Sequence, residues 1–272
     1  MKTNISLALV ILLTAFSAAG CRTEAILGNP DETKTVSENV PETGSEKIEE
    51  GLSMVTLAVS GKNLAIITID PEFFSFSVYE NGSPESAKTI REIHEENKAM
   101  LTFNGGFYTE DFKPTGLLVS RGKVLRKLSG ADLLDGIIAI DKSGKARFFS
   151  ESKNIDAKNL RFAIQNGPVL IDENGNIPLT GDSNEKASRT ALGIDNKGNL
   201  VLIVMKQSLL NTDNTISLYE LAHLLKETPG LAGMELHSVV NLDGGPSTGF
   251  MIGDHYYPEM EKVQNVVVVK KA

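Results

Sequence analysis

Short apolar runs, many of them alternating with polar residues, dominate the chain from about residue 51 onward and are separated by glycine and asparagine turns. In residues 74–79, phenylalanine and valine alternate with serine and tyrosine. A period of two predicts a strand with one buried face. The pattern predicts further strands at 54–59, 64–69, 117–120, 123–128 and 263–270, and strand pairs around the turns at 142–144, 173–175 and 196–199.

Two helices are predicted to interrupt the strands. The first begins at Ser83, which is followed by a proline in the first-turn position. The second begins at Ser217, because Glu220 completes a capping box and leucines follow at helical spacing. Each helix precedes an apolar strand, at 99–103 and 238–242, and each of these strands runs directly into a pair of glycines. The two glycine pairs are therefore the first places to look for function.

The first 21 residues predict export. A short basic start, an apolar run at 5–16 and small residues before Cys21 form a secretory signal. The apolar run is shorter than the roughly 20 residues of a transmembrane helix. Small residues before a cysteine resemble the bacterial lipoprotein processing site, so Cys21 is predicted to carry lipid. The alternative is an ordinary cleaved signal with an incidental cysteine nearby.

The segment after Cys21 predicts a tether. Residues 22–50 hold eight acidic and three basic side chains and no aromatic residue, a composition that cannot bury a core. The expected organisation is a signal peptide at 1–20, a lipidated cysteine and acidic tether at 21–50, and one domain at 51–272. This organisation predicts a lipoprotein of the bacterial cell envelope, attached to the membrane by its lipid, with the domain outside the cytoplasm.

Composition excludes several classes of protein. The chain has 272 residues, of which 41% are hydrophobic and 23% charged, close to the averages for globular proteins. Its net charge of -8 and its lack of a basic stretch argue against nucleic acid as a partner. The single cysteine cannot form an internal disulfide, nor can it supply a zinc site made of several thiolates.

The two glycine pairs lie beside polar residues that could bind a ligand or take part in catalysis. Asn104 precedes Gly105 and Gly106, which predicts a cradle of backbone N–H groups for an anion or a hydroxyl. Asp243 precedes Gly244 and Gly245, and Ser247 follows; a carboxylate here suits acid–base chemistry or metal binding. Plain turns are the alternative for both segments, because Asn-Gly and Asp-Gly are common turn dipeptides.

Two polar residues between the glycine pairs complete the candidate set. Asn166 precedes a Gly-Pro step and an apolar strand. Arg189 opens another strand, where its guanidinium could clamp a phosphate or a carboxylate. A surface ion pair is the alternative for this arginine.

The order of these motifs resembles the phosphodiester glycosidase family. NGGFY is followed by QNGPVL, SRTALG, the capped helix SLYELAHLL and NLDGG, so the resemblance spans about Ala99 to Val269. Pro246 departs from the pattern, because relatives often carry glycine or another small residue there. The resemblance implies an α+β domain of mixed, mostly antiparallel β-sheet with a few helices, whose strand-end loops form the active-site cleft. It also implies hydrolysis of a sugar linked through its anomeric carbon to a phosphodiester.

The resemblance assigns roles to the candidate residues. Arg189 is expected to hold the phosphodiester, and Asp243 to act at the anomeric carbon as acid–base or nucleophile. The substrate would contact Asn104, Gly105, Gly106, Asn166, Gly244, Gly245 and Ser247. A partner carboxylate is open by residue type among Glu110, Asp111, Asp182 and Glu185.

The sequence alone does not decide three questions: whether a metal is bound, whether the protein is an enzyme, and which bond is cleaved. Asp243 with a second carboxylate would suit Ca²⁺ or Mg²⁺, which prefer oxygen ligands, but no metal-ligand spacing singles out a site. A surface lipoprotein that binds a glycan or an envelope polymer without turnover is an alternative to the enzyme. A phosphodiesterase that cuts P–O instead of C–O is a third possibility. The sugar, expected to be N-acetylglucosamine-like, and its polymer are not encoded in these motifs.

Overall fold

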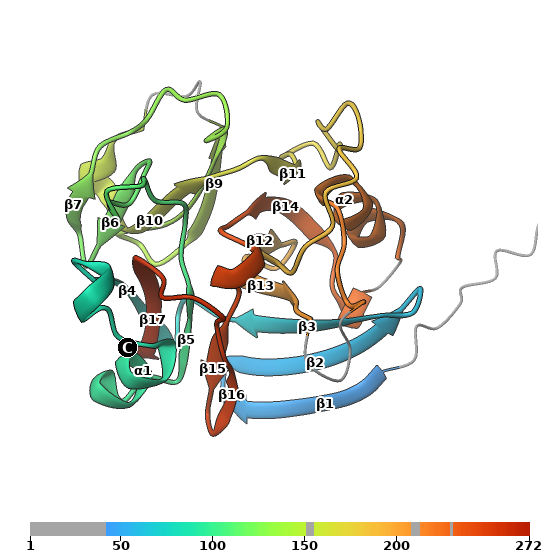
Figure 1. The fold of residues 1–272 in the computed structure, drawn as a ribbon, viewed down its shortest axis with the longest axis horizontal. Helices are drawn as coiled ribbons and strands as arrows, with labels where there is room; N and C mark the ends of the chain where they lie inside the picture. Colours follow the sequence, from blue (N-terminus) through green and yellow to red (C-terminus); the bar gives the residue numbers. More distant parts are fainter. Residues whose placement is uncertain (1–41, 151–154, 208–212, 229–230) are drawn as a thin grey trace, which may run out of the picture. The chain divides into compact units, whose positions relative to one another are not determined.

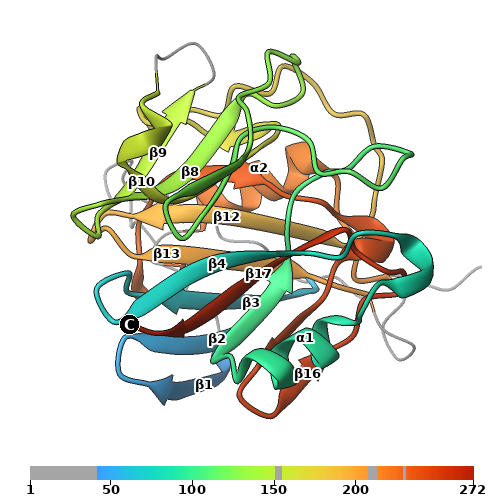
Figure 2. The same cartoon turned by 90° about the vertical axis from the view of Figure 1, so that its left-hand side faces the viewer.

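The computed structural model describes residues 42–150, 155–207, 213–228 and 231–272, shown in Figure 1 and, turned by 90°, in Figure 2. Three β-sheets and two α-helices make up this part of the chain. The strands within each sheet pair antiparallel, which agrees with the expected α+β class. The predicted signal peptide, Cys21 and tether residues 21–41 lie outside the described residues. No helix of the described chain is long and apolar enough to cross a membrane.

The largest sheet has seven strands in the order β1-β2-β3-β13-β12-β14-β11. Its strands are β1 (Glu42–Glu49), β2 (Leu52–Val59), β3 (Lys62–Ile69), β11 (Val169–Ile171), β12 (Arg189–Asp195), β13 (Leu200–Met205) and β14 (Leu236–Asn241). The strands predicted at 54–59 and 64–69 pair as β2 and β3, and the strand pair predicted around 196–199 is confirmed.

Strand β1 corrects the predicted extent of the tether. Residues 42–49 pair with β2 and form an edge of the seven-stranded sheet, so the domain begins before residue 51. Composition misled the prediction because an edge strand is held by its main-chain hydrogen bonds and tolerates charged side chains that no core strand would accept.

Two five-stranded sheets complete the architecture. One has the order β7-β6-β10-β8-β9 and the other β16-β15-β5-β17-β4. The first contains β6 (Leu118–Ser120), β7 (Lys123–Arg126), β8 (Gly136–Asp141), β9 (Ala146–Ser150) and β10 (Leu160–Asn166). The second contains β4 (Phe74–Glu80), β5 (Leu101–Asn104), β15 (Phe250–Ile252), β16 (His255–Tyr257) and β17 (Asn265–Lys271). The turn at 173–175 follows β11, but no second strand follows it, which corrects the predicted pair.

All three sheets bury side chains in one shared core. Ile67, Phe162 and Val267 come from different sheets and belong to the same buried cluster. A second cluster lies on the opposite face of the seven-stranded sheet, beneath α2 (Leu218–Glu227). Burial of this apolar area is the main favourable term that holds the sheets together.

The helix predicted at Ser217 is confirmed, with its capping box to Glu220, whereas the other helix begins later than predicted. Helix α1 spans Ile90–Asn97 and is capped by Thr89, whose side chain accepts from the Glu92 N–H while Glu92 accepts from the Thr89 N–H. The Ser83 segment forms only a short 3-10 turn over Pro84–Ser86. Because the chain is extended again at Ala87, the stronger capping box six residues further on sets the start of the helix.

Candidate active site

The two predicted glycine turns lie side by side, and Asn104 joins them. The Asn104 Nδ2 donates to the carbonyl of Asp243 (2.8 Å), and the Asp243 N–H donates to the carbonyl of Gly105 (3.2 Å). The Asn104 Oδ1 accepts from the Thr190 hydroxyl (2.8 Å) at the start of β12. Segments 139 residues apart in the chain therefore meet where strands β5, β12 and β14 end or begin.

Gly105 and Gly244 allow close packing, and the N–H groups of all four glycines are hydrogen-bonded within the chain. The N–H of Gly105 donates to the carbonyl of Asn265 (2.9 Å), and that of Gly106 to its Oδ1 (2.8 Å). The N–H of Gly244 donates to the Asp243 Oδ1 (2.9 Å), and that of Gly245 to the carbonyl of Ser188 (2.8 Å). All four donors are used within the chain, so the predicted cradle of free N–H groups is not present in this structure. A Cβ on Gly105 would clash with the Asn265 side chain, and one on Gly244 would lie 3.0 Å from the Ser188 carbonyl oxygen.

Buried asparagines form the scaffold of the site. Asn104 and Asn166 are fully buried, and Asn241 and Asn265 nearly so. Asn166 accepts from the Phe107 N–H (3.2 Å) and donates to the carbonyl of Asn241 (2.9 Å). Asn104 and Asn166 were expected to contact the substrate; in the structure their side chains are buried and hydrogen-bonded within the chain, and contact with substrate stays a prediction. Asn104 joins the two glycine turns, Asn265 holds the Gly105–Gly106 turn, and the Asn166 and Asn241 amides tie the end of β10 to the end of β14.

Asp243 is the residue of this region that is best suited to catalysis. Burial raises the pKa of its carboxyl from an ordinary value near 3.8 to about 6, and the nearby Glu261 carboxylate acts in the same direction. Hydrogen bonds from Ser247 and from the Gly244 N–H oppose this shift. A pKa near 6 allows the carboxyl to exchange a proton near neutral pH, as a general acid or base must.

Tyr108 and Ser247 lie next to this carboxyl. Burial raises the pKa of the Tyr108 hydroxyl, hydrogen bonding to Ser247 opposes that, and the charges of Asp243 and Glu261 add to the rise. The buried Ser247 thus interacts with both Asp243 and Tyr108. Ser247 was a predicted site residue, whereas Tyr108 was missed although it ends the NGGFY motif. Its aromatic ring also packs edge-on against Phe112.

The carboxylate that acts on Asp243 is Glu261, which was not among the four predicted partners. Glu261 follows β16 in a loop that is fastened to the Asp243 turn, because the N–H groups of Met260 (2.8 Å) and Glu261 (3.2 Å) both donate to the carbonyl of Pro246. Of the predicted partners, Asp111 pairs with Lys113 on the surface. Nothing in the sequence alone brings residue 261 close to residue 243.

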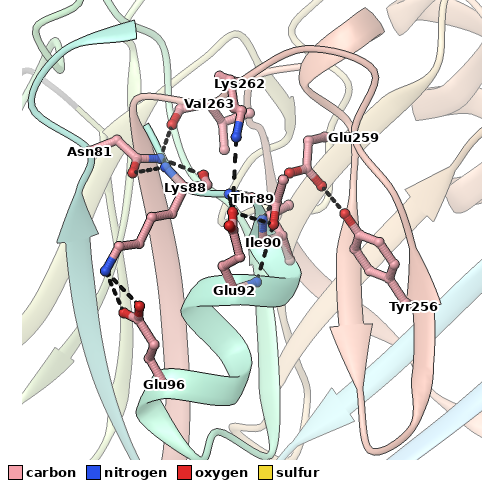
Figure 3. Close-up of polar contacts among 10 residues, drawn as sticks. All are labelled: Asn81, Lys88, Thr89, Ile90, Glu92, Glu96, Tyr256, Glu259, Lys262 and Val263. Carbon is pink, nitrogen blue, oxygen red and sulfur yellow. Dashed lines mark hydrogen bonds and ion pairs between the residues drawn. The ribbon is translucent and has the colours of Figure 1, made fainter. Parts of the chain in front are cut away.

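The loop that carries Glu261 is also fixed to helix α1, as Figure 3 shows. The Glu259 carboxylate accepts from the Ile90 N–H (2.8 Å) and from the Tyr256 hydroxyl (2.9 Å). Lys262 lies 3.9 Å from the Glu92 carboxylate. These contacts hold the loop at both sides of Glu261 and so define its position at the site.

Arg189 lies beside the Asp243 turn, and two of its guanidinium nitrogens donate hydrogen bonds within the chain. Its Nε donates to the carbonyl of Ile216 (3.0 Å), and its Nη2 donates to the carbonyl of Glu185. Its Cδ would be 3.8 Å from a Cβ on Gly244. Burial lowers the pKa of Arg189, and Glu185 opposes that. The guanidinium therefore brings a positive charge to this end of the sheet while it clamps two loops.

Among the described residues, no cluster of His, Cys, Asp or Glu side chains supports the Ca²⁺ or Mg²⁺ site considered from the sequence. No group of three or more His, Cys, Asp or Glu side chains that could hold a metal ion occurs within the part of the chain that the structure describes. A cavity of about 510 Å³ lies instead at the opposite end of β10, where Leu160 and Phe162 help to line it, and none of the candidate residues borders it.

Comparisons with known proteins find relatives of this chain. The chain is 28% identical over 204 residues to YigE of Escherichia coli, an uncharacterised protein, covering 68% of this chain and 73% of YigE. It is 27% identical over 201 residues to N-acetylglucosamine-1-phosphodiester alpha-N-acetylglucosaminidase of Bos taurus, covering 65% of this chain but only 37% of the bovine enzyme. The chain thus spans well under half the length of that relative.

Solved structures show the same fold. A hypothetical protein from Synechocystis matches with a TM-score of 0.64 and 17% identity over 86% of this chain and 64% of its own. The catalytic domain of the zebrafish N-acetylglucosamine-1-phosphodiester alpha-N-acetylglucosaminidase, auto-inhibited by its pro-peptide, matches with a TM-score of 0.61 and 18% identity over 86% of this chain and 85% of its own. Residues 97–270, more than half of the sequence and all of the candidate active site, match the phosphodiester glycosidase family model, so the chain belongs to the phosphodiester glycosidase family.

Proposed function

We propose that this protein hydrolyses a glycosyl phosphodiester, releasing the sugar and leaving a phosphomonoester. Family membership supports a hydrolase of this class, because the mammalian relatives are named for that reaction. The observation that carries the proposal is the Asp243 carboxyl, whose burial raises its pKa to about 6 at the junction of two glycine turns. Such a shift costs stability, and costly shifts concentrate where a group does chemistry.

The chemistry at the sugar follows from the leaving group. A phosphomonoester is a good leaving group, so the bond between the anomeric carbon and oxygen can break with its electron pair going to the phosphate oxygen. Asp243, ionised above its pKa, either takes the proton of the water that attacks the anomeric carbon or attacks that carbon itself. The first route inverts the anomeric configuration, and the second retains it through a glycosyl-enzyme that water then hydrolyses.

The neighbours of Asp243 support this role. Arg189 supplies positive charge on the side of the Gly244 turn, where it offsets negative charge that grows on the departing phosphate. Ser247 interacts with both the Asp243 carboxyl and the Tyr108 hydroxyl and so links the two groups. Glu261 is the second carboxylate of the site.

A turnover assay in ¹⁸O-labelled water tests the proposal. The full chain is incubated with N-acetylglucosamine joined through its α-anomeric oxygen to methyl phosphate. The expected result is free sugar that carries the label, with unlabelled methyl phosphate, because water attacks carbon. Label in the phosphate would show P–O cleavage instead, and binding without release of sugar would support a non-catalytic glycan-binding lipoprotein.

We also propose that Cys21 anchors the protein in the bacterial cell envelope through lipid. Small residues before this cysteine support lipid attachment at a processing site. Labelling of growing cells with a palmitate analogue should tag the wild-type protein and leave a Cys21→Ala variant unlabelled and absent from the membrane fraction. Equal labelling of both proteins would contradict the anchor.

A further inference from the structure

Lys206 has a buried ammonium without a partner next to the candidate active site. Its Nζ is inaccessible to solvent and has no hydrogen-bond partner among the described residues. Burial lowers the pKa of this amine, and the charge of Glu259 opposes the shift. A buried charge that lacks a hydrogen-bonded counter-ion is costly, so its presence calls for a physical explanation.

The position of Lys206 follows from the strand register. Arg189 and Met205 are the last pair of the β12–β13 ladder, and Ser188 and Lys206 are the next residues beyond this pair. The Gln207 N–H donates to the Ser188 hydroxyl (3.1 Å), which keeps the two segments together beyond the ladder. On the other side of Ser188 lies Gly245, which donates to its carbonyl (2.8 Å). Neighbouring strands are about 4.8 Å apart, so two such steps place the Lys206 backbone about 10 Å from the Gly244–Gly245 turn. A lysine side chain can cover more than half of that distance.

The side chain also lies on the relevant face of the sheet. Side chains alternate along a strand, so Lys206 shares a face with Val204, which is opposite Thr190. The hydroxyl of Thr190 donates to Asn104, whose amide donates to the carbonyl of Asp243. Lys206 therefore extends from the strand end on the same face as the residues that hold the Asp243 turn.

Lys206 differs from Arg189 in the donors that it has free. Arg189 donates to the carbonyls of Ile216 and Glu185, so its orientation is fixed by its own chain. The Lys206 ammonium has three N–H donors, none of which is bound to a described residue. No hydrogen bond to a described residue must therefore break when the Lys206 ammonium binds an anion.

We propose that Lys206 is a specificity-determining residue whose ammonium binds the phosphate of the substrate. The inference rests on the proposed function, and it adds a residue that none of the motifs pointed to. The substrate phosphate supplies the counter-ion for the buried ammonium. The positive charge then favours anionic phosphodiesters over neutral glycosides.

The test compares Lys206→Met with Lys197→Met, which removes the same charge from the exposed turn between β12 and β13. A charge-assisted hydrogen bond contributes about 1.5–3 kcal/mol, which corresponds to about 10- to 150-fold in affinity. Lys206→Met should raise KM for the glycosyl phosphodiester and the inhibition constant of inorganic phosphate by such a factor. Lys206→Arg should recover part of both. Hydrolysis of the neutral p-nitrophenyl N-acetyl-α-glucosaminide should stay within about threefold of wild type.

The outcomes separate this inference from the proposed function. If wild type hydrolyses the phosphodiester and Lys206→Met matches Lys197→Met in KM and in phosphate inhibition, the role of Lys206 is wrong and the function stands. If wild type binds inorganic phosphate through Lys206 but releases no sugar from phosphodiesters, the anion site stands and the function is wrong. An equal loss on the neutral glycoside would show a structural role and overturn the inference.

A measurement on the wild-type protein guards against a variant that fails to fold. With lysine labelled by ¹⁵N at Nζ, the Lys206 ammonium signal, assigned with Lys206→Arg, should shift as inorganic phosphate is added. The Lys197 signal should stay in place. An unchanged Lys206 signal at saturating phosphate would overturn the proposal without reference to any variant's activity.

Discussion

Asp243 and Asp141 follow similar local patterns and end in opposite electrostatic states. Asp243 follows β14 and precedes Gly244, whereas Asp141 ends β8 and precedes a turn that contains Gly144. Burial raises the pKa of Asp243 to about 6. Partial burial also pushes the pKa of Asp141 upward, but hydrogen bonds from Ser143, Arg147 and Lys145 outweigh it and lower the pKa to about 2.

The difference lies in what surrounds each carboxylate in the folded chain. Asp141 is satisfied by its own turn and by a cation, Arg147, only six residues away (Nε–Oδ2 2.9 Å). Asp243 has one backbone donor, a serine, and a second carboxylate delivered by a distant loop. A strand-end aspartate beside glycine therefore predicts a turn, and only tertiary surroundings separate a structural carboxylate from a reactive one.

The largest expected effect is on turnover. Asp243→Asn should lower kcat for the glycosyl phosphodiester by about 10²–10⁴-fold, because it removes the proton-accepting or nucleophilic carboxylate while preserving shape. Asp141→Asn should leave kcat within about twofold, since its turn lies outside the candidate site. Steady-state kinetics of both variants, with circular dichroism as a check on folding, make the comparison. Near-normal turnover by Asp243→Asn would remove Asp243 from the mechanism.

The second effect concerns the packing that positions Asp243. Gly105→Ala should lower the free energy of unfolding by about 3 kcal/mol, because the added methyl group meets Asn265. Gly130→Ala is the matched control: its Cβ would meet nothing within 4 Å, so we expect a change within about 0.5 kcal/mol. Urea unfolding measures both. Equal stabilities of the two variants would mean that the glycine turns are not tightly packed.

The third effect is on the pH dependence of stability, and its sign differs between the two aspartates. Because the pKa of Asp243 is raised to about 6 in the folded state, its protonation stabilises the folded protein. This contribution to the free energy of unfolding is fully present below about pH 3.8 and is lost as the pH rises through 6. Asp243→Asn should therefore be more stable than wild type at pH 8 by up to about 3 kcal/mol, and close to wild type at pH 3.5.

Asp141 should behave in the opposite way. Its lowered pKa contributes stability above about 3.8 that is lost as pH falls toward 2. Asp141→Asn should be less stable than wild type at pH 8 by about 1–2 kcal/mol. Urea unfolding of wild type and both variants at pH 3.5 and pH 8 measures these changes in the free energy of unfolding. If both variants changed it in the same direction at pH 8, the proposed difference between Asp243 and Asp141 would be wrong.

Much of the fold could be predicted because local signals were strong. Alternating strands, tight turns and the Ser217 capping box each act within a few residues, and the structure has them where predicted. Strand β1 was missed because its pairing with β2, not its own side chains, makes it a strand. The start of α1 was placed too early because two capping signals lie six residues apart and only one caps the helix.

The candidate site could be predicted only in part. The glycine turns and Asp243 are visible as motifs, and the structure brings them together through Asn104. The burial of the asparagines was not visible, since an amide that binds substrate and one that fixes two turns look alike in a sequence. Glu261 and Lys206 reach the site through a loop and a strand register, which depend on contacts between distant segments.

A titration of the Asp243 carboxyl tests the central claim most directly. With aspartate labelled by ¹³C at the carboxyl carbon, and with Asp243→Asn used for assignment, the Asp243 signal should titrate with a midpoint near 6. The acid limb of kcat/KM for the glycosyl phosphodiester should have the same midpoint, because the ionised carboxylate does the work. A midpoint near 4, or a rate that is unchanged between pH 5 and 7, would contradict the account.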